Sequence, residues 1–326
     1  MQKLKSILRK RWVHSALQLT ALAILLGFLA YAFRGTWRDA EPRLRSASLA
    51  DLGIACAILA GYYLLFVAGW VRILAAYEIR VPYRIALQAE MLSMLAKYVP
   101  GGVWTPAARV VAMRRVGVTD TPKVLASVLL EAGLSAISGV LVFLASLSAV
   151  DSVRAPLLPL LGFAGLCAVL LHPRVFRPLA RRVLRPFGAS EVPPLPYRTM
   201  VGLLAYYAVT WVVGGAALYF LIRAVGEDPG ASAIPFLGGT SAVGAVVAVL
   251  SIIAPSGLGV REASMYGLML AVASQGAALG ATVLNRVAIT VVEAGLLLVG
   301  MLAWRLRVGQ IDPADLGSEG EVPART

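Results

Sequence analysis

Long apolar runs alternate with short polar connections along this chain, and their length predicts membrane-spanning helices. A helix needs roughly 20 apolar residues to cross about 30 Å of hydrocarbon, because it rises about 1.5 Å per residue. The pattern therefore predicts an all-α polytopic membrane protein with six full transmembrane helices. The predicted spans are Ser15 to Phe33, Leu52 to Tyr77, Val124 to Val150, Ala155 to Leu171, Met200 to Ile222 and Ala278 to Trp304.

Two further apolar stretches, 85–113 and 233–272, are interrupted near the middle by proline and glycine. Proline removes a backbone donor and clashes with the preceding turn, whereas glycine permits the chain to reverse. Each stretch is therefore predicted to form a broken hairpin, whose irregular tip must be shielded from lipid by protein or water. The predicted tips contain Pro100, Gly101 and Gly102 in the first hairpin, and Pro255, Ser256, Gly257 and Gly259 in the second.

Composition and charge agree with a membrane protein. The 326 residues are 59% hydrophobic and 14% charged, which exceeds what a soluble core needs. The net charge is +13, but the basic residues lie between apolar runs and form no single stripe, so we expect no nucleic-acid partner. If both broken stretches return to their own side, 21 of the 30 Lys and Arg residues face one compartment and six face the other. The positive-inside rule then predicts that both termini are cytoplasmic.

The distribution of cysteine and histidine argues against several kinds of site. Cys56 and Cys167 both lie inside apolar runs, and His14 and His172 are far apart in the sequence. This pattern does not favour a disulfide framework, a zinc site or a histidine-based triad. We therefore expect neither a metal nor a cofactor.

A shift of 155 residues aligns the two interrupted tips and matches residues 126–129 with residues 281–284, which indicates an internal repeat. Each copy would contain two spans, a broken hairpin and one long span. Because this is an odd number of crossings, the second copy is predicted to be inserted upside down, as in many secondary transporters. The predicted parts are a basic N-terminus (1–14), repeat 1 (15–150), repeat 2 (151–307) and a disordered cytoplasmic tail (308–326).

Several ionisable residues fall within the predicted membrane segments, where a lone charge costs roughly 2.5 to 3.5 kcal/mol or more. One interpretation is a set of neutralised structural pairs, with Arg286 beside Glu131 or Glu293. The other is a polar cavity that binds a charged headgroup, in which the cations bind phosphate and the acids orient them or contact an amine. The candidate substrate-binding residues are Lys97, Arg109, Glu131, Arg261, Glu262, Arg286 and Glu293, and Glu90 is a further intramembrane acid.

The motifs KYVPGGVW (97–104) and PSGLGVRE (255–262), with Arg109 and Glu131, resemble the lysylphosphatidylglycerol synthase transmembrane-region family. The resemblance extends from about Leu52 to Arg307. That family includes the flippase portion of multiple peptide resistance factor and stand-alone inner-membrane proteins. The resemblance implies a lipid-translocating module in the bacterial plasma (inner) membrane.

The expected function is transport, without covalent chemistry, of a phospholipid or a polyprenyl-phosphate-linked lipid between leaflets by alternating access. Because the chain contains no nucleotide-binding signature, we expect the drive to come from an ion gradient, from downhill lipid flow or from synthesis on one side. No histidine is placed to activate Ser256 as a nucleophile, which argues against a protease. One alternative is a membrane-embedded glycosyltransferase using Asp39 and Glu41. Another is a non-catalytic scaffold for a lipid-modifying synthase. The expected partners are a membrane lipid substrate and such a synthase, and self-association into a homo-oligomer stays open.

Overall fold

The computed structural model describes residues 37–96, 104–147, 195–250 and 259–305, together with the isolated positions 166, 169, 174, 175, 178, 181 and 182. Within these residues all regular structure is helical and there is no strand. The predicted span 15–33, nearly all of the span 155–171, both chain ends and all predicted tip residues except Gly259 lie outside the described residues.

Five of the described helices are long and apolar enough to cross a membrane. Four of them coincide with predicted spans, which confirms an all-α polytopic membrane protein. These four are α2 (Leu49–Ala76), α5 (Thr121–Ser146), α8 (Tyr197–Ala224) and α11 (Gln275–Arg305).

The first interrupted stretch folds as two helices, α3 (Tyr83–Ala96) and α4 (Trp104–Arg115), which pack against each other. Ile85 near the start of α3 shares a hydrophobic cluster with Met113 near the end of α4. The chain therefore leaves this hairpin at the same end of the bundle at which it came in, as predicted.

The second interrupted stretch begins with the 3-10 turn η3 (Ala231–Ala233) and α9 (Ile234–Leu250), and α10 (Val260–Met269) follows the tip. The segment before the predicted tip is helical, as predicted, and Ala231–Val249 is the fifth segment long and apolar enough to cross a membrane. Its glycines do not break the helix. They lie where neighbouring helices approach closely: Gly238 faces the carbonyl of Trp211, and Gly239 faces the backbone of Phe143.

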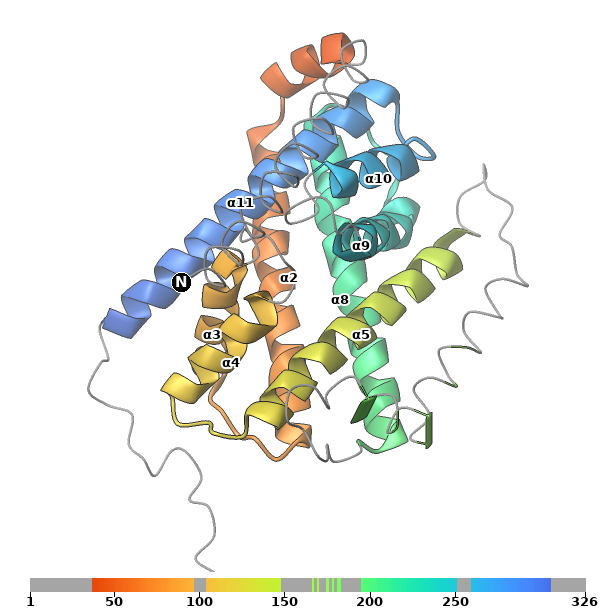
Figure 1. Cartoon of the computed structure of the whole chain (residues 1–326). Helices are drawn as coiled ribbons and strands as arrows, with labels where there is room; N and C mark the ends of the chain where they lie inside the picture. The colour runs from red at the N-terminus through yellow and green to blue at the C-terminus, as the bar shows by residue number, and fades with distance from the viewer. Residues whose placement is uncertain are drawn as a thin grey trace, which may run out of the picture.

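The helices of the two predicted halves pack in matching pairs (Figure 1). The long helices α2 and α8 pack against each other at the centre. Each hairpin then contacts the long final helix of the other half, since α9 packs on α5 and α3 packs on α11. The interface between the halves is therefore built from equivalent contacts.

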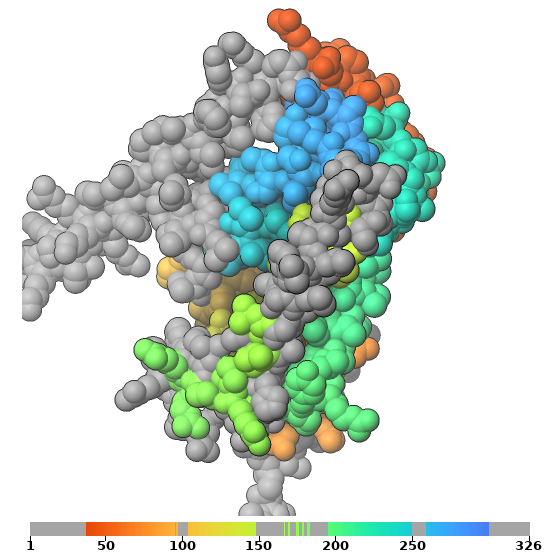
Figure 2. Space-filling model, turned by 90° about the vertical axis from the view of Figure 1, so that its right-hand side faces the viewer, coloured from red at the N-terminus to blue at the C-terminus, as the bar shows by residue number. Residues whose placement is uncertain are grey.

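One end of the bundle is tied together by polar contacts around Glu227. Its carboxylate accepts hydrogen bonds from the Ser274 backbone N–H (2.8 Å) and hydroxyl (2.5 Å), and lies 3.7 Å from Arg43. The Ser48 N–H donates to the Ala224 carbonyl at 2.8 Å. In Figure 2 the segment that begins at residue 37 lies at this end, beside the start of α11. The second hairpin leaves this end, whereas the first leaves the opposite end, as an inverted repeat predicts.

The exposed side of α11 is apolar. Val287, Val291 and Leu298 are each at least half exposed and lie at helical spacing on one face. The buried face of the same helix includes Ala288 and Val292. A wide exposed apolar stripe on a long helix is the surface expected against lipid chains.

We expect the close crossing of α8 and α9 to tolerate no added methyl group. A Cβ at Gly215 would collide with the Ile234 carbonyl oxygen, whereas one at Gly202, on the same helix, meets nothing within 4 Å. Gly215→Ala should lower the free energy of unfolding by roughly 1 to 3 kcal/mol through overpacking. Gly202→Ala should leave it unchanged or raise it by up to about 1 kcal/mol. Thermal unfolding in detergent measures both, and equal behaviour of the two variants would contradict the close packing.

The orientation of the bundle is testable with single cysteines in a chain lacking Cys56 and Cys167. A cysteine at Glu227 should react with an impermeant maleimide added outside intact cells. A cysteine at Glu78, in the connection between α2 and α3, should react only after the cells are permeabilised. The reverse labelling pattern would show the opposite orientation, in which neither terminus is cytoplasmic.

Candidate functional site

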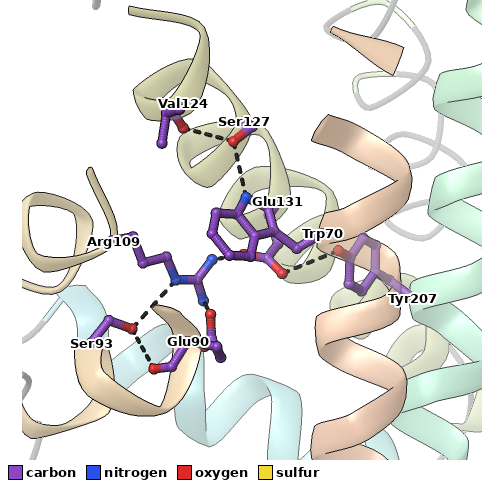
Figure 3. A network of polar contacts seen from close by, with 8 residues as sticks. All are labelled: Trp70, Glu90, Ser93, Arg109, Val124, Ser127, Glu131 and Tyr207. Carbon is purple, nitrogen blue, oxygen red and sulfur yellow. Dashed lines mark hydrogen bonds and ion pairs between the residues drawn. The ribbon is translucent and has the colours of Figure 1, made fainter. Parts of the chain in front are cut away.

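A buried guanidinium lies between two carboxylates where the first hairpin meets α5 (Figure 3). Arg109 of α4 forms ion pairs with Glu90 of α3 and with Glu131 of α5. Arg109 and Glu90 are each 5% exposed and Glu131 is 2% exposed, so the three groups are withdrawn from solvent. We call these three residues the carboxylate–arginine cluster.

Neutral groups from four helices surround this cluster. The face of the Trp70 ring lies 4.7 Å from the Arg109 guanidinium carbon, which places a cation over an aromatic ring. The Ser93 hydroxyl accepts from Arg109 Nε at 3.4 Å, and the Tyr207 hydroxyl donates to Glu131 at 3.3 Å. The Trp70 indole in turn donates to Ser127 Oγ at 2.9 Å. The cluster therefore links α2, α3, α4, α5 and α8.

Local sequence spacing explains how these groups meet. Ser127 and Glu131 are one turn apart on α5, and Glu90 and Ser93 are about one turn apart on α3, so each pair faces the same direction. Arg109 lies in the middle of α4, which packs on both helices. The hairpin thus carries one acid and the base, and α5 carries the second acid.

The predicted pairing of Glu131 with Arg286 is wrong. Glu131 binds Arg109, and Arg286 Nη1 lies 3.5 Å from Glu262 Oε1. Arg109, one of the candidate substrate-binding residues, is buried. Glu90 was identified as an intramembrane acid but not as a site residue. The only sequence signal for Glu90 as a site residue was a Glu placed three residues before a Ser on an apolar helix.

A second polar cluster is formed by α10 and α11. Glu262 Oε1 pairs with Arg286, and Glu262 Oε2 accepts the Gly259 backbone N–H at 2.7 Å, which caps the start of α10. The side chains of Arg286 and Glu262 are 26% and 23% exposed. This pair is therefore longer and more open than the carboxylate–arginine cluster.

Two adjacent tyrosines of α2 lie between the clusters. The Tyr63 hydroxyl donates to Glu293 of α11 at 2.6 Å. The Arg261 guanidinium lies near enough to interact electrostatically with the hydroxyls of both Tyr62 and Tyr63, and the two acids Glu90 and Glu131 act on Tyr62. Arg261 Nε is buried and makes no hydrogen bond. The structure thus brings Arg261, Glu262, Arg286 and Glu293 into one region.

Some predicted site residues lie outside the described residues. These are Lys97, Pro100, Gly101, Gly102, Pro255, Ser256 and Gly257. Of the predicted tip residues only Gly259 is described, with φ of 83°, a left-handed conformation that glycine adopts without strain.

The acids of the glycosyltransferase alternative lie elsewhere. Asp39 and Glu41 are on the helical segment 37–45 at the end of the bundle that contains Glu227. Glu41 forms an ion pair with Arg45 at 2.7 Å, and Asp39 packs against Gly276 at the start of α11. Glu41 is therefore held in a local ion pair, whereas Asp39 is exposed and only its backbone and Cβ approach Gly276.

Comparison with known proteins identifies the family. The family model described as the lysylphosphatidylglycerol synthase TM region matches residues 18–309. The match covers most of the chain, so the protein belongs to this family, as the motifs indicated. No curated protein matches the chain.

We expect Arg109 to be essential for stability. Arg109→Gln leaves two buried carboxylates without a cation, and breaking a buried pair in this way typically costs about 3 to 5 kcal/mol. Adding Glu90→Gln and Glu131→Gln should recover much of the loss, because no buried charge then remains. Arg45→Gln, which removes an exposed surface pair, is the control and should change the thermal midpoint little. A midpoint for Arg109→Gln equal to that of the control would contradict a tightly bound cluster.

Proposed function

We propose that the protein moves a lipid with a phosphate-containing headgroup between the leaflets of the bacterial inner membrane, without covalent chemistry. The observation that carries this proposal is the presence of intramembrane charges between two hairpins that begin at opposite ends of the bundle. A charge inside the membrane is costly, and intramembrane ionisable groups commonly mark a substrate pathway. Membership of the family supports the same conclusion.

The second polar cluster is the better candidate for headgroup recognition. A phosphate that leaves water needs replacement donors, and arginine offers a planar pair of N–H groups. Arg109 is already held by two carboxylates, so its donors are occupied. Among the described residues, Arg286 pairs with a partly exposed acid at 3.5 Å, and the buried Arg261 Nε has no hydrogen-bond partner. We therefore assign phosphate binding to Arg261 and Arg286.

The remaining acids have different roles in this proposal. Glu262 orients Arg286 and caps α10, so a phosphate would compete with it for the guanidinium. Glu293 is held by Tyr63 and lies two turns after Arg286 on α11. An amine on the lipid headgroup would be attracted to these two carboxylates. Lipids carrying both a phosphate and an amine would thus match both charges of the site.

The matching contacts of the two halves suit alternating access. Because each hairpin packs on the final helix of the other half, a rocking motion can exchange one set of contacts for an equivalent set. Two states of similar energy follow from this equivalence. A lipid-modifying synthase that makes the substrate would be the expected partner, and both termini would face the cytoplasm.

Reconstitution of the purified chain in liposomes tests the proposal. We expect the protein to exchange labelled phosphatidylglycerol, aminoacylated phosphatidylglycerol or a polyprenyl-phosphate lipid between leaflets faster than empty liposomes do. Arg261→Gln and Arg286→Gln should each slow the exchange roughly tenfold or more, since a hydrogen bond to a charged group is worth about 1.5 to 3 kcal/mol. Arg45→Gln is the matched control, because it removes an exposed guanidinium far from the cluster.

Two outcomes would count against the proposal. Exchange no faster than in empty liposomes for all three lipids would reject lipid translocation. Exchange that is fast but unaffected by both arginine variants would keep translocation and reject the assigned phosphate site. Sugar transfer abolished by Asp39→Ala would instead favour the glycosyltransferase alternative.

A further inference from the structure

The carboxylate–arginine cluster contains more negative than positive charge. Glu90 and Glu131 both bind the single guanidinium of Arg109, and all three side chains are at least 90% buried. With both acids ionised the cluster would carry one uncompensated negative charge, which is strongly disfavoured away from water. One proton on either acid makes the cluster neutral.

Within the part of the chain that the structure describes, no second cation contacts the cluster. Among the described residues, those in direct contact with the cluster are neutral: Trp70 of α2, Ser93 of α3 and Tyr207 of α8. The hydroxyl of Tyr62 on α2 is influenced by Glu90 and Glu131 and also by Arg261 of the second hairpin. On that side Arg261 of α10 and Glu293 of α11 act together on Tyr63, and their charges offset each other.

We propose that Glu90 and Glu131 form a proton-binding site that couples lipid translocation to a proton gradient. The coupling rests on the proposed function, whereas the proton site does not. The proton is assigned to the pair and not to one acid, because both carboxylates bind the same guanidinium. It is taken up from water on one side as a carboxyl O–H and released to water on the other side. No other bond is made or broken.

The position of the two acids explains how a proton can act on the hairpin. Glu90 is on α3 and Arg109 on α4, so both belong to the first hairpin, whereas Glu131 belongs to α5. An ionised Glu131 holds the hairpin on α5 through Arg109. Protonation of Glu131 weakens that attachment and leaves the Arg109–Glu90 pair within the hairpin. The protonation state therefore sets how firmly the hairpin is bound to its neighbour.

The wild-type protein in liposomes tests the coupling directly. We would set a pH difference of about one unit across the membrane, clamp the voltage at zero with potassium and valinomycin, and measure the leaflet distribution of labelled phosphatidylglycerol. One proton per lipid predicts a distribution ratio of about ten, because one pH unit corresponds to about 1.4 kcal/mol. Fast exchange with equal leaflets would overturn the coupling and leave translocation intact. The absence of exchange at every pH, for phosphatidylglycerol and for the other two lipids named above, would instead reject both translocation and the coupling.

Infrared difference spectroscopy tests the proton site without transport. Above about pH 6 exposed carboxyls are ionised, so a remaining protonated carboxyl band reports a buried acid. We expect this band in the wild type and in the control Glu78→Gln, whose side chain is exposed in a connection. It should be lost in Glu90→Gln, where Arg109 and Glu131 balance each other. A wild type without the band, or a Glu90→Gln variant that keeps it, would overturn the proposal. If Glu90→Gln does not fold, the wild-type spectrum alone decides.

Discussion

Burying an arginine between two carboxylates is the constraint on which the arrangement of the first half depends. In a medium of low dielectric constant an unpaired charge is far more costly than in water, so Arg109 must keep its partners. Those partners lie on α3 and α5, and the Trp70 and Tyr207 contacts extend the same network to α2 and α8. A hairpin that does not span the membrane is thereby held at a defined depth against helices that do.

In the second half, the hairpin is held against its neighbours by weaker charge pairing and by closer backbone packing. Its hairpin begins with a helix of membrane-spanning length, and Gly215 and Gly238 allow the backbones of α8 and α9 to approach each other. Packing of this kind is the main source of helix association in lipid, where hydrophobic burial contributes little. The carboxylate Glu262 is then used to cap α10 and to hold Arg286 loosely, and it is not buried. The two halves share contacts between helices but differ in how they are stabilised.

Sequence predicted the spans well because lipid imposes a simple rule: a long apolar run must satisfy its own backbone hydrogen bonds as a helix. It also located both hairpins, since proline and glycine interrupt otherwise apolar stretches. It could not assign partners to the charges, because pairing depends on the rotation of each helix and on which helices are neighbours. The repeat offset placed Glu131 opposite Arg286, whereas Glu131 lies beside Arg109. Nor could the sequence show that Gly238 and Gly239 lie at close crossings, because this too depends on which helices are neighbours.

The contrast between the two polar clusters fits the two roles proposed for them, headgroup binding at one and proton binding at the other. A site that binds and releases a charged headgroup must be able to give up its own ion pairs, which a saturated and buried cluster does only at high energetic cost. An open pair such as Arg286 and Glu262 can exchange one partner for another with little loss. The saturated cluster is suited to respond to a proton, which is small enough to reach a closed site and changes its charge by one unit. Tyr62 of α2 is influenced by Glu90 and Glu131 and also by Arg261, and the adjacent Tyr63 by Glu293 and Arg261, so α2 lies beside both groups of charges. The proposed coupling between a proton and a lipid would therefore act through the shared helix α2 and would need no long pathway.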